Sequence, residues 1–418
     1  MSCKYNEVKL GDVCIFGDGA HTKVNRVENG IPYLTSKNIK NGYIDLQNVD
    51  YITNEDYIKL FGESQKSVRH LQEGDVLIGI IGTFGNCYLY KDNDKFGISS
   101  SIAIARPNKD LVNPKFLYYY LSSDRFKKYT DMYKGGSVQG YTNLPTLRKI
   151  PMYLPPLEKQ EKIADILSSL DDKIELNNEM NKTLEEMAQS IFKRWFVDFE
   201  FPNEDGLPYK SSGGEMVESE LGMIPKGWEV TNIDDICIKV TSGGTPSRKN
   251  KDYYDGDIIW IKTKELNDTF LFDSEEKISS IGLEKSSAKL FPPKTVMIAM
   301  YGATVGKLGI SSTMITFNQA TCGMVVNTEV CCYEYLYLHL INQREKLKNL
   351  AIGSAQQNLS VSVIKEYNII KPIKQIIEKF KNIIKPIYDK IECNQNNTQS
   401  LKSLRDELLP KLMRNEKK

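Results

Sequence analysis

One stretch of this chain occurs twice, and the second copy lies 217 positions after the first. Asp172-Lys173-Ile174-Glu175 returns as Asp389-Lys390-Ile391-Glu392. When residues 163–196 are paired with those 217 positions later, seven of the 34 pairs are identical and most apolar positions stay apolar. A period of about half the chain indicates two related modules rather than a solenoid of short repeats. Two copies of one module can engage two sites at once.

Apolar residues around both copies recur at steps of three and four, which predicts two long helices. The first seam includes Leu167, Leu170, Ile174, Asn177 and Leu184, and the second includes Ile384, Ile391, Asn394 and Leu401. A seam kept over more than four heptads is the signature of a coiled coil, so the two helices are expected to pack against each other. Asn occupies the matching position in both, and a buried Asn costs stability but fixes register and partner.

The second seam is less regular than the first. It contains Pro386 and the polar Arg405. Because an internal proline removes one helix hydrogen bond and clashes with the preceding turn, we expect a kink or a late start of the helix at Pro386.

The remaining sequence divides into two mixed modules. Residues 1–154 alternate short apolar runs with Gly, Asn and Asp turns, and a helix is predicted over Asn113 to Tyr129. Residues 225–371 repeat this plan. The first long helix falls in 155–200, a linker rich in Gly, Pro, Ser and Glu in 201–224, and the second helix in 372–418. We therefore predict an α+β fold with two similar mixed α/β domains.

Composition limits the function classes. The 55 Lys and Arg residues nearly balance 54 Asp and Glu residues, so DNA contacts must come from local patches or from a partner. The eight cysteines form no CxxC pair, which favours reduced thiols in a cytoplasmic protein. No run of about 18 apolar residues occurs, so no membrane span is expected.

Catalytic motifs are absent from the sequence. It has no GxGxxG after a strand, no Walker A loop, and neither Asn-Pro-Pro-aromatic nor Asp-Pro-Pro-aromatic. The three histidines, His21, His70 and His339, fall at unrelated places in the two modules. The chain is therefore not expected to be an enzyme itself, nor to hold a metal.

Polar residues at repeated positions are the candidates for DNA contact. Lys37 and Asn38 follow a short strand, as Lys264 and Glu265 do in the second module. Lysine can reach phosphate or guanine and asparagine can pair with adenine, but a solvated turn would look the same. The full candidate set is Lys23, Arg26, Lys37, Asn38, Thr83, Ser137, Gln139, Arg248, Lys249, Lys262, Lys264, Thr304, Ser354 and Gln356.

Two kinds of loop supply the other members of this set. Gly82-Thr83-Phe84-Gly85 and Gly302-Ala303-Thr304-Val305-Gly306 could bring backbone N–H groups close to phosphate, although a tight turn explains these glycines equally well. The second kind places a hydroxyl and an amide before the final strand, as Ser137 with Gln139 and as Ser354 with Gln356.

Several longer stretches resemble the specificity subunit of type I restriction-modification systems. They are Ile191-Phe192-Lys193-Arg194-Trp195-Phe196-Val197-Asp198-Phe199-Glu200-Phe201-Pro202, then residues 208–215 and 221–228, and the Pro-Leu-Glu-Lys-Gln-Glu-Lys-Ile run at 156–163. The resemblance covers the whole chain.

The resemblance implies a fold and a function. Family members carry two target recognition domains, each reading one half of a split DNA sequence, and two helices that form an antiparallel coiled coil with pseudo-twofold symmetry. The helical rod sets the gap between half-sites and docks two methyltransferase subunits, which bring S-adenosylmethionine. Restriction subunits that use ATP with Mg can join. By this resemblance the chain binds double-stranded DNA and holds no cofactor; the alternative is a protein-binding scaffold without DNA selectivity.

Overall fold

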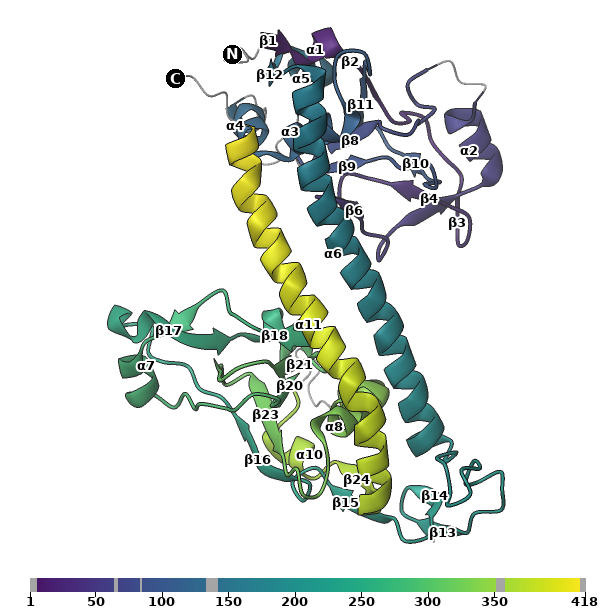
Figure 1. Cartoon of the computed structure of the whole chain (residues 1–418), viewed down its shortest axis with the longest axis vertical. Coiled ribbons are helices and arrows are strands. Elements are labelled where there is room, and N and C mark those ends of the chain that lie inside the picture. Colours follow the sequence, from purple (N-terminus) through teal and green to yellow (C-terminus); the bar gives the residue numbers. More distant parts are fainter. Residues whose placement is uncertain (1–5, 64–66, 83–84, 133–141, 351–357, 414–418) are drawn as a thin grey trace. The chain divides into compact units, whose positions relative to one another are not determined.

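The computed structural model describes residues 6–63, 67–82, 85–132, 142–350 and 358–413 (Figure 1). The chain forms two compact units. The first unit contains residues 1–174 and 400–418, and the second contains residues 175–399. Both long helices, α6 (Leu157–Phe192) and α11 (Lys374–Leu412), contribute residues to both units.

The first unit is built on three small sheets and a layer of helices. Their strand orders are β1-β12, β2-β11-β8-β9 and β10-β4-β7-β3, and a short β5-β6 hairpin lies beside them. The strands are β1 Asn6–Lys9, β2 Cys14–Asp18, β3 Arg26–Val27, β4 Ile31–Leu34, β5 Ile39–Lys40, β6 Tyr43–Ile44, β7 Asp50–Ile52, β8 Val76–Gly79, β9 Cys87–Leu89, β10 Gly97–Ile98, β11 Ile102–Pro107 and β12 Pro151–Leu154. The helices are α1 Leu10–Val13, α2 Asn54–Phe61, α3 Pro114–Ser122, α4 Asp124–Met132 and α5 Leu144–Lys149.

The second unit repeats the core of this plan. Its sheets are β15-β24, β16-β23-β20-β21-β18, which has a fifth strand, β19-β17-β22, which has no counterpart of β3, and a two-stranded β13-β14 sheet. The strands are β13 Met216–Ser219, β14 Gly222–Pro225, β15 Glu229–Asn232, β16 Cys237–Ser242, β17 Tyr254–Ile261, β18 Thr269–Leu271, β19 Lys277–Ile278, β20 Val296–Ala299, β21 Leu308–Ser311, β22 Thr316–Phe317, β23 Thr321–Val326 and β24 Asn368–Lys371. The helices are α7 Ser280–Glu284, α8 Tyr333–Asn342, α9 Arg344–Asn349 and α10 Val361–Lys365, with 3₁₀ turns at Lys251–Tyr253, Thr263–Glu265 and Gly302–Thr304.

Strand directions match as well as strand order. β4 pairs parallel with β10 and antiparallel with β7, and β17 pairs parallel with β22 and antiparallel with β19. In the larger sheets, the central strands β11 and β23 are antiparallel to both of their neighbours. The prediction of two similar mixed α/β domains is therefore confirmed.

The helix predicted over Asn113 to Tyr129 is divided in two. Asn113 caps α3 by accepting from the Phe116 N–H at 3.1 Å, and α3 ends at Ser122. Ser123 adopts an extended conformation and its hydroxyl bonds back to the Tyr120 carbonyl at 2.6 Å, after which α4 begins. A serine hydroxyl that bonds to a nearby backbone carbonyl competes with the hydrogen bonds of the helix. The break between α3 and α4 was not predicted.

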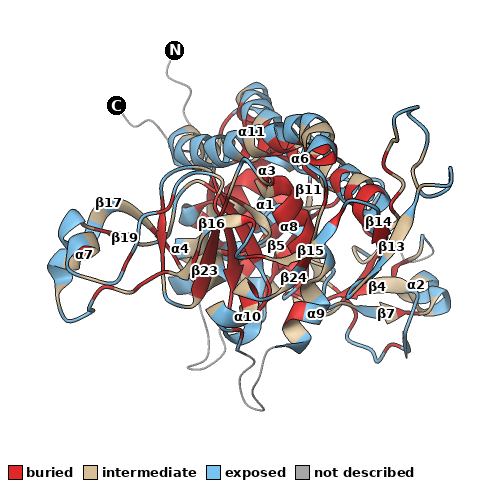
Figure 2. Cartoon of the chain, turned by 90° about the horizontal axis from the view of Figure 1, so that it is seen from below, coloured by how far each residue is buried: buried red, intermediate tan, exposed pale blue. Residues whose placement is uncertain are grey.

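The seams of α6 and α11 are buried in both units. In the first unit Ile163, Ala164 and Leu167 of α6 join the sheet core together with Leu408 and Leu412 from the end of α11. In the second unit the end of α6 meets the beginning of α11, where the rings of Trp195 and Phe380 lie 5.9 Å apart. The helices therefore pair antiparallel within each unit, and Figure 2 shows exposed residues along their outer side. After Phe192, α6 continues as a π-helical turn, Lys193–Val197.

A layer of four polar side chains interrupts the apolar seam in the second unit. Asn177, Asn181, Asn394 and Thr398 are all buried. The Asn177 amide donates to Thr398 Oγ1 at 3.4 Å, and the Asn394 amide donates to Asn181 Oδ1 at 2.9 Å. A shift of 217 positions carries Asn177 to Asn394 and Asn181 to Thr398, so it exchanges the two hydrogen bonds. Both predicted seam asparagines thus find partners, as buried polar groups require.

Of the kink or late start expected at Pro386, the late start is wrong. The helix begins at Lys374 and includes Pro386 without a break. Pro386 lies on the exposed side of α11, with Ile384 buried two residues earlier. The apolar contacts of the seam on both sides of Pro386 hold the helix together despite one lost hydrogen bond.

The linker also packs more tightly than its composition suggests. Phe199 and Phe201 are buried, and the Phe201 ring stacks on Trp228 at 5.0 Å and on Tyr209 at 4.6 Å. These rings belong to the core of the second unit. In the described part of the chain, no helix is long and apolar enough to cross a membrane.

Candidate nucleic-acid interface

Loops far apart in the sequence meet at one place in each unit, which we call the junction. In the first unit the Ser99 N–H donates to the Leu34 carbonyl, Ile80 N–H to Ser101, and Thr142 N–H to Ile80, at 2.9–3.1 Å. The second unit has the same three bonds, from Asn318 to Ile261, from Met300 to Ala320 and from Leu359 to Met300, at 2.8–3.0 Å. The described segments that border the repeated polar stretches therefore meet in three dimensions.

One glycine in each unit makes the junction possible. A Cβ added to Gly19 would lie 2.2 Å from the Ile98 carbonyl oxygen, and one added to Gly243 would lie 1.9 Å from that of Phe317. No side chain fits at these distances. Glycine therefore lets the segment after β2 pass close to the backbone of β10, and the segment after β16 pass close to the backbone of β22. The sequence reading did not identify these two glycines.

Asn38 does not serve as a base reader in this structure. Its side chain is buried, and Oδ1 accepts from the Thr35 N–H at 2.9 Å and from the Thr35 hydroxyl at 3.0 Å. Its amide nitrogen donates to the carbonyls of Asp45 and Asn48 at 3.0 and 3.3 Å. Because these four bonds use the amide fully, we remove Asn38 from the predicted DNA contacts.

Glu265, which stands where the first unit has Asn38, has the same structural task. Its carboxylate accepts from the Lys262 N–H at 2.9 Å, as Asn38 accepts from Thr35, and also from the Glu275 N–H at 3.0 Å. Asn38 and Glu265 are thus two different side chains that cap equivalent loops, and their difference does not indicate that they contact different bases. The lysines before them, Lys37 and Lys264, are exposed and remain candidates.

Three cations of the second unit already have acidic partners. The Arg248 guanidinium forms two hydrogen bonds to the Glu276 carboxylate, one of them 3.0 Å, and lies 4.3 Å from the Tyr254 ring centre. Lys262 pairs with the same carboxylate, and Lys264 pairs with Glu275. Arg248, followed by Lys262, lowers the pKa of Glu276 to about 2. These pairs reduce the positive charge that the second unit offers to phosphate.

The other candidates are spread around the loops. Lys23 and Lys249 are exposed, and Arg26 Nε lies 2.8 Å from Asp50. The glycines at 82, 85, 302 and 306 have φ between 73° and 80°, so their turns require glycine whatever else they bind. Thr304 is half-buried beside the second of these turns. Thr83, Ser137, Gln139, Ser354 and Gln356 lie outside the described residues.

Polar side chains that the sequence reading missed also line the junction. The hydroxyls of Ser99 and Ser101 lie 2.7 Å apart, and the Thr245 hydroxyl donates to the exposed Gln319 amide in the second unit. Ser99 and Ser101 lie between β10 and β11, Gln319 lies between β22 and β23, and Thr245 lies in the segment after β16. The match of Gly97-Ile98-Ser99 to Thr316-Phe317-Asn318 before a buried strand was the available signal.

The histidines and cysteines have local structural roles. His21 Nε2 lies 2.7 Å from Asp18, and His70 Nδ1 lies 3.1 Å from the Phe61 carbonyl. Burial lowers the pKa of His339 to about 4 and raises the pKa of the Cys87 thiol to about 12. Among the described residues, no group of three or more His, Cys, Asp or Glu side chains could hold a metal ion.

The sequence matches the model of the type I restriction modification DNA specificity domain twice, over residues 3–186 and 225–403. The chain is 29% identical to the type I restriction enzyme HindI specificity subunit of Haemophilus influenzae, over 85% of this chain and 88% of that protein. It is 28% identical to the MjaIX specificity subunit of Methanocaldococcus jannaschii, over 95% and 89%.

A solved structure shows the same fold. The type I restriction-modification S subunit from M. genitalium superposes with a TM-score of 0.62 at 14% identity, covering 98% of this chain and 96% of that one. Two matches to one family model, two units with one strand order and a shared fold all agree. The chain belongs to the type I restriction-modification specificity family and is a non-catalytic specificity subunit, not an enzyme.

Proposed function

We propose that this chain gives a type I restriction-modification enzyme its DNA sequence specificity, with each unit's target recognition domain reading one half of a bipartite site. One observation carries the proposal: the two domains share a backbone, junction included, but present different side chains at equivalent places. Lys37 is exposed without an ion pair among the described residues, whereas Lys264 is paired with Glu275. Two readers on one backbone can thus select different half-sequences.

The helices α6 and α11 suit the second part of this function, which is spacing and assembly. We propose that they fix the gap between the half-sites and dock two methyltransferase subunits. Large apolar residues are exposed at repeat-equivalent positions of these helices: Ile166 and Ile383 at 46% and 44%, and Met187 and Leu404 at 48% and 44%. Each unit contains one residue of each pair, so each offers an equivalent apolar contact to one partner copy.

The chemistry would then belong to the partners. S-adenosylmethionine would be held by the methyltransferase subunits, and ATP with Mg by restriction subunits where these join. The specificity chain would hold no cofactor and would act in the cytoplasm, where the DNA is.

Methylation mapping tests the assignment of half-sites. We expect the chain, expressed with its methyltransferase subunits, to direct methylation to one bipartite motif, read by long-read sequencing. Lys37→Ala should relax one half only and Lys264→Ala the other half only, since a good base contact discriminates by about 1–3 kcal/mol. Lys285→Ala is the matched control, since Lys285 is exposed and ion-paired as Lys264 is but is not a candidate DNA contact. Equal loss at both halves in either variant would contradict one-domain, one-half reading.

A further inference from the structure

The side chains of Asp268 in the second unit and Asn41 in the first bond to equivalent places, although the residue whose backbone matches Asp268 is Gly42, the next along the chain from Asn41. The Asp268 carboxylate accepts from the Leu308 N–H at 3.0 Å, and the Asn41 side-chain oxygen accepts from the Cys87 N–H at 3.2 Å. Leu308 and Cys87 open the equivalent strands β21 and β9. The two residues thus make the same bond to the same edge, but only one of them is charged.

In the second unit this carboxylate neutralises two cations. Arg344 of α9 binds it at 2.5 and 3.2 Å, and Lys307 lies 3.1 Å from it. The three groups together carry a net charge of +1, and the carboxylate holds both cations at one place. The Asp268 carboxylate therefore marks a position in this fold where a negative charge is bound by basic side chains.

In the first unit a cation remains but the carboxylate does not. Lys127 lies on α4, which follows α3 as α9 follows α8, and it faces Gly85 as Arg344 faces the equivalent Gly306. Among the described residues Lys127 has no ion pair. Because the Asn41 oxygen is held by Cys87, the amide N–H₂ group is the end of Asn41 that is left to donate.

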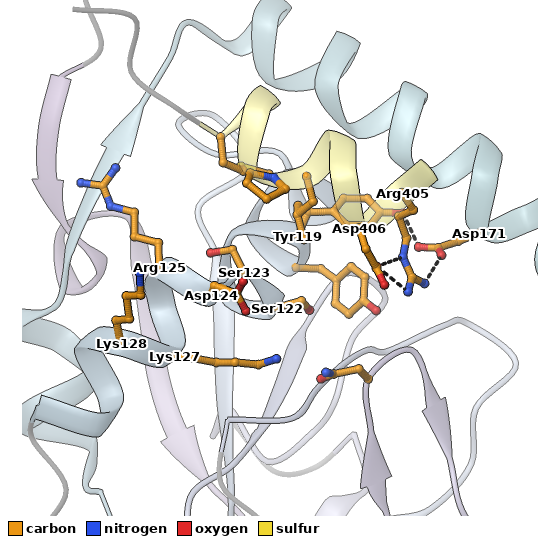
Figure 3. A pocket seen from close by; sticks show the side chains of 15 residues that line it. Tyr119, Ser122, Ser123, Asp124, Arg125, Lys127, Lys128, Asp171, Arg405 and Asp406 are labelled. Carbon is orange, nitrogen blue, oxygen red and sulfur yellow. Dashed lines mark hydrogen bonds and ion pairs between the residues drawn. The ribbon is translucent and has the colours of Figure 1, made fainter. Parts of the chain in front are cut away.

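A cavity of about 620 Å³ opens at this place within the first unit. Lys127, Asn41 and Ser122 line it, and the buried Ser122 hydroxyl, which lies beside Cys87 and Tyr118, has no partner at hydrogen-bond geometry among the described residues. Figure 3 shows Lys127 reaching toward Ser122, whereas Arg125 and Lys128 of the same helix point away from it.

Arg405 partly neutralises the acidic side of the cavity, because two carboxylates share its guanidinium. Asp171 accepts from Arg405 at 2.8 Å and from the Tyr119 hydroxyl at 2.7 Å, and Asp406 accepts from Arg405 at 2.9 Å. Asp124 lines the cavity as well but forms no ion pair with Lys127. The free donors are therefore a cation, an amide and a hydroxyl on one side, which is a donor set for an oxyanion.

We propose that Lys127, Asn41 and Ser122 form a phosphate site in the first unit, which the second unit fills with its own Asp268. The site adjoins the loop after Lys37 and the turn that ends at Gly85, so a phosphodiester of bound DNA is its occupant. This rests on the proposed function and assigns the two domains unequal contacts to the DNA backbone. The first domain binds a DNA phosphate at the place where the second domain has its own carboxylate, that of Asp268.

The salt dependence of DNA binding tests this site. The full chain with its methyltransferase subunits is titrated with a duplex carrying its methylated motif, at salt concentrations from 50 to 200 mM. Lys127→Met should reduce the slope of log K against log salt by about 0.9, so that the wild type loses roughly threefold more affinity than the variant across this range. The methylated motif should not change, because phosphate carries no sequence information.

Two further variants separate the site from general charge and folding effects. Lys128→Met removes the same charge from the same helix and should leave the slope as in the wild type. Asn41→Asp places the second unit's carboxylate in the first unit; it should raise the melting temperature and weaken DNA binding as Lys127→Met does. An unchanged slope in both Lys127→Met and Asn41→Asp overturns the proposal.

The source of the oxyanion is settled by inorganic phosphate. If 10 mM phosphate stabilises the wild type but not Lys127→Met against heat, while the DNA slope is the same in both, the occupant is a free anion and the assignment to DNA is overturned. Failure of the proposed function looks different, because the wild-type complex would then select no bipartite duplex at all.

Discussion

The chemical role of a polar residue in this chain is set by its partners rather than by its type. Asn38 was predicted to contact a base, but Asn38 and Glu265 instead cap equivalent loops from within. Arg248 looked like a phosphate contact and is held by Glu276 against Tyr254. Sequence shows which side chains repeat or differ, but not whether their hydrogen-bonding groups are already used.

Glu276 offers a test of this point. With Arg248 and Lys262 as partners its pKa falls to about 2, below the unfolded value, so its contribution to stability is present above pH 4.5 and is lost as the pH falls toward 2. Glu276→Gln should cost about 1–2 kcal/mol at pH 7 after allowance for partial exposure, and this cost should shrink below pH 4.5. Urea unfolding of the full chain at several pH values measures it.

The same variant frees two cations for DNA. We expect Glu276→Gln to raise the affinity of the complex for DNA of unrelated sequence and to steepen its salt dependence. Glu284→Gln, an exposed acid of the same domain without Arg248 as partner, is the control. A weaker or unchanged salt dependence in Glu276→Gln would show that Arg248 and Lys262 do not face the DNA.

At the scale of elements, periodicity predicted far more than composition did. The seams of both long helices follow from steps of three and four, and Leu167, Ile174, Asn177, Ile384, Ile391 and Asn394 are all buried. The misses are places where tertiary contacts override a local rule: Pro386 stays inside α11, and Ser123 ends α3. The linker aromatics Phe199 and Phe201 were missed because they carry no periodicity.

The exposed faces of the long helices yield a prediction about assembly. Ile166→Asp and Ile383→Asp should each release one methyltransferase subunit, because losing a buried large apolar contact costs up to about 3 kcal/mol, or roughly a hundredfold in affinity. Native mass spectrometry of the complex counts the subunits. Glu161→Ala, an exposed position on another side of α6, should keep both. Two retained subunits in both isoleucine variants would exclude these faces as docking sites.

For the whole molecule, the repeat implies that the gap between the two half-sites can be changed without changing the sequence of either half-site. Seven residues inserted into both α6 and α11, beside the polar layer, preserve the heptad phase and lengthen each helix by about 10.5 Å. That length is about three base pairs of B-DNA at 3.4 Å each, so the methylated motif should keep both halves and gain about three base pairs of gap. Long-read methylation mapping reads this directly, and an unaltered gap would refute the role of the helices in spacing.

The first unit is made of two separate stretches of chain, and this has a consequence for synthesis on the ribosome. The second unit is complete once residue 399 has left the exit tunnel, whereas the first, although begun earlier, still lacks residues 400–418. The core of the first unit is covered by three residues from this late segment, Leu408, Leu409 and Leu412. The domain translated first is therefore the last to close, and a chain cut back to residue 407 would leave its apolar interior without these three leucines.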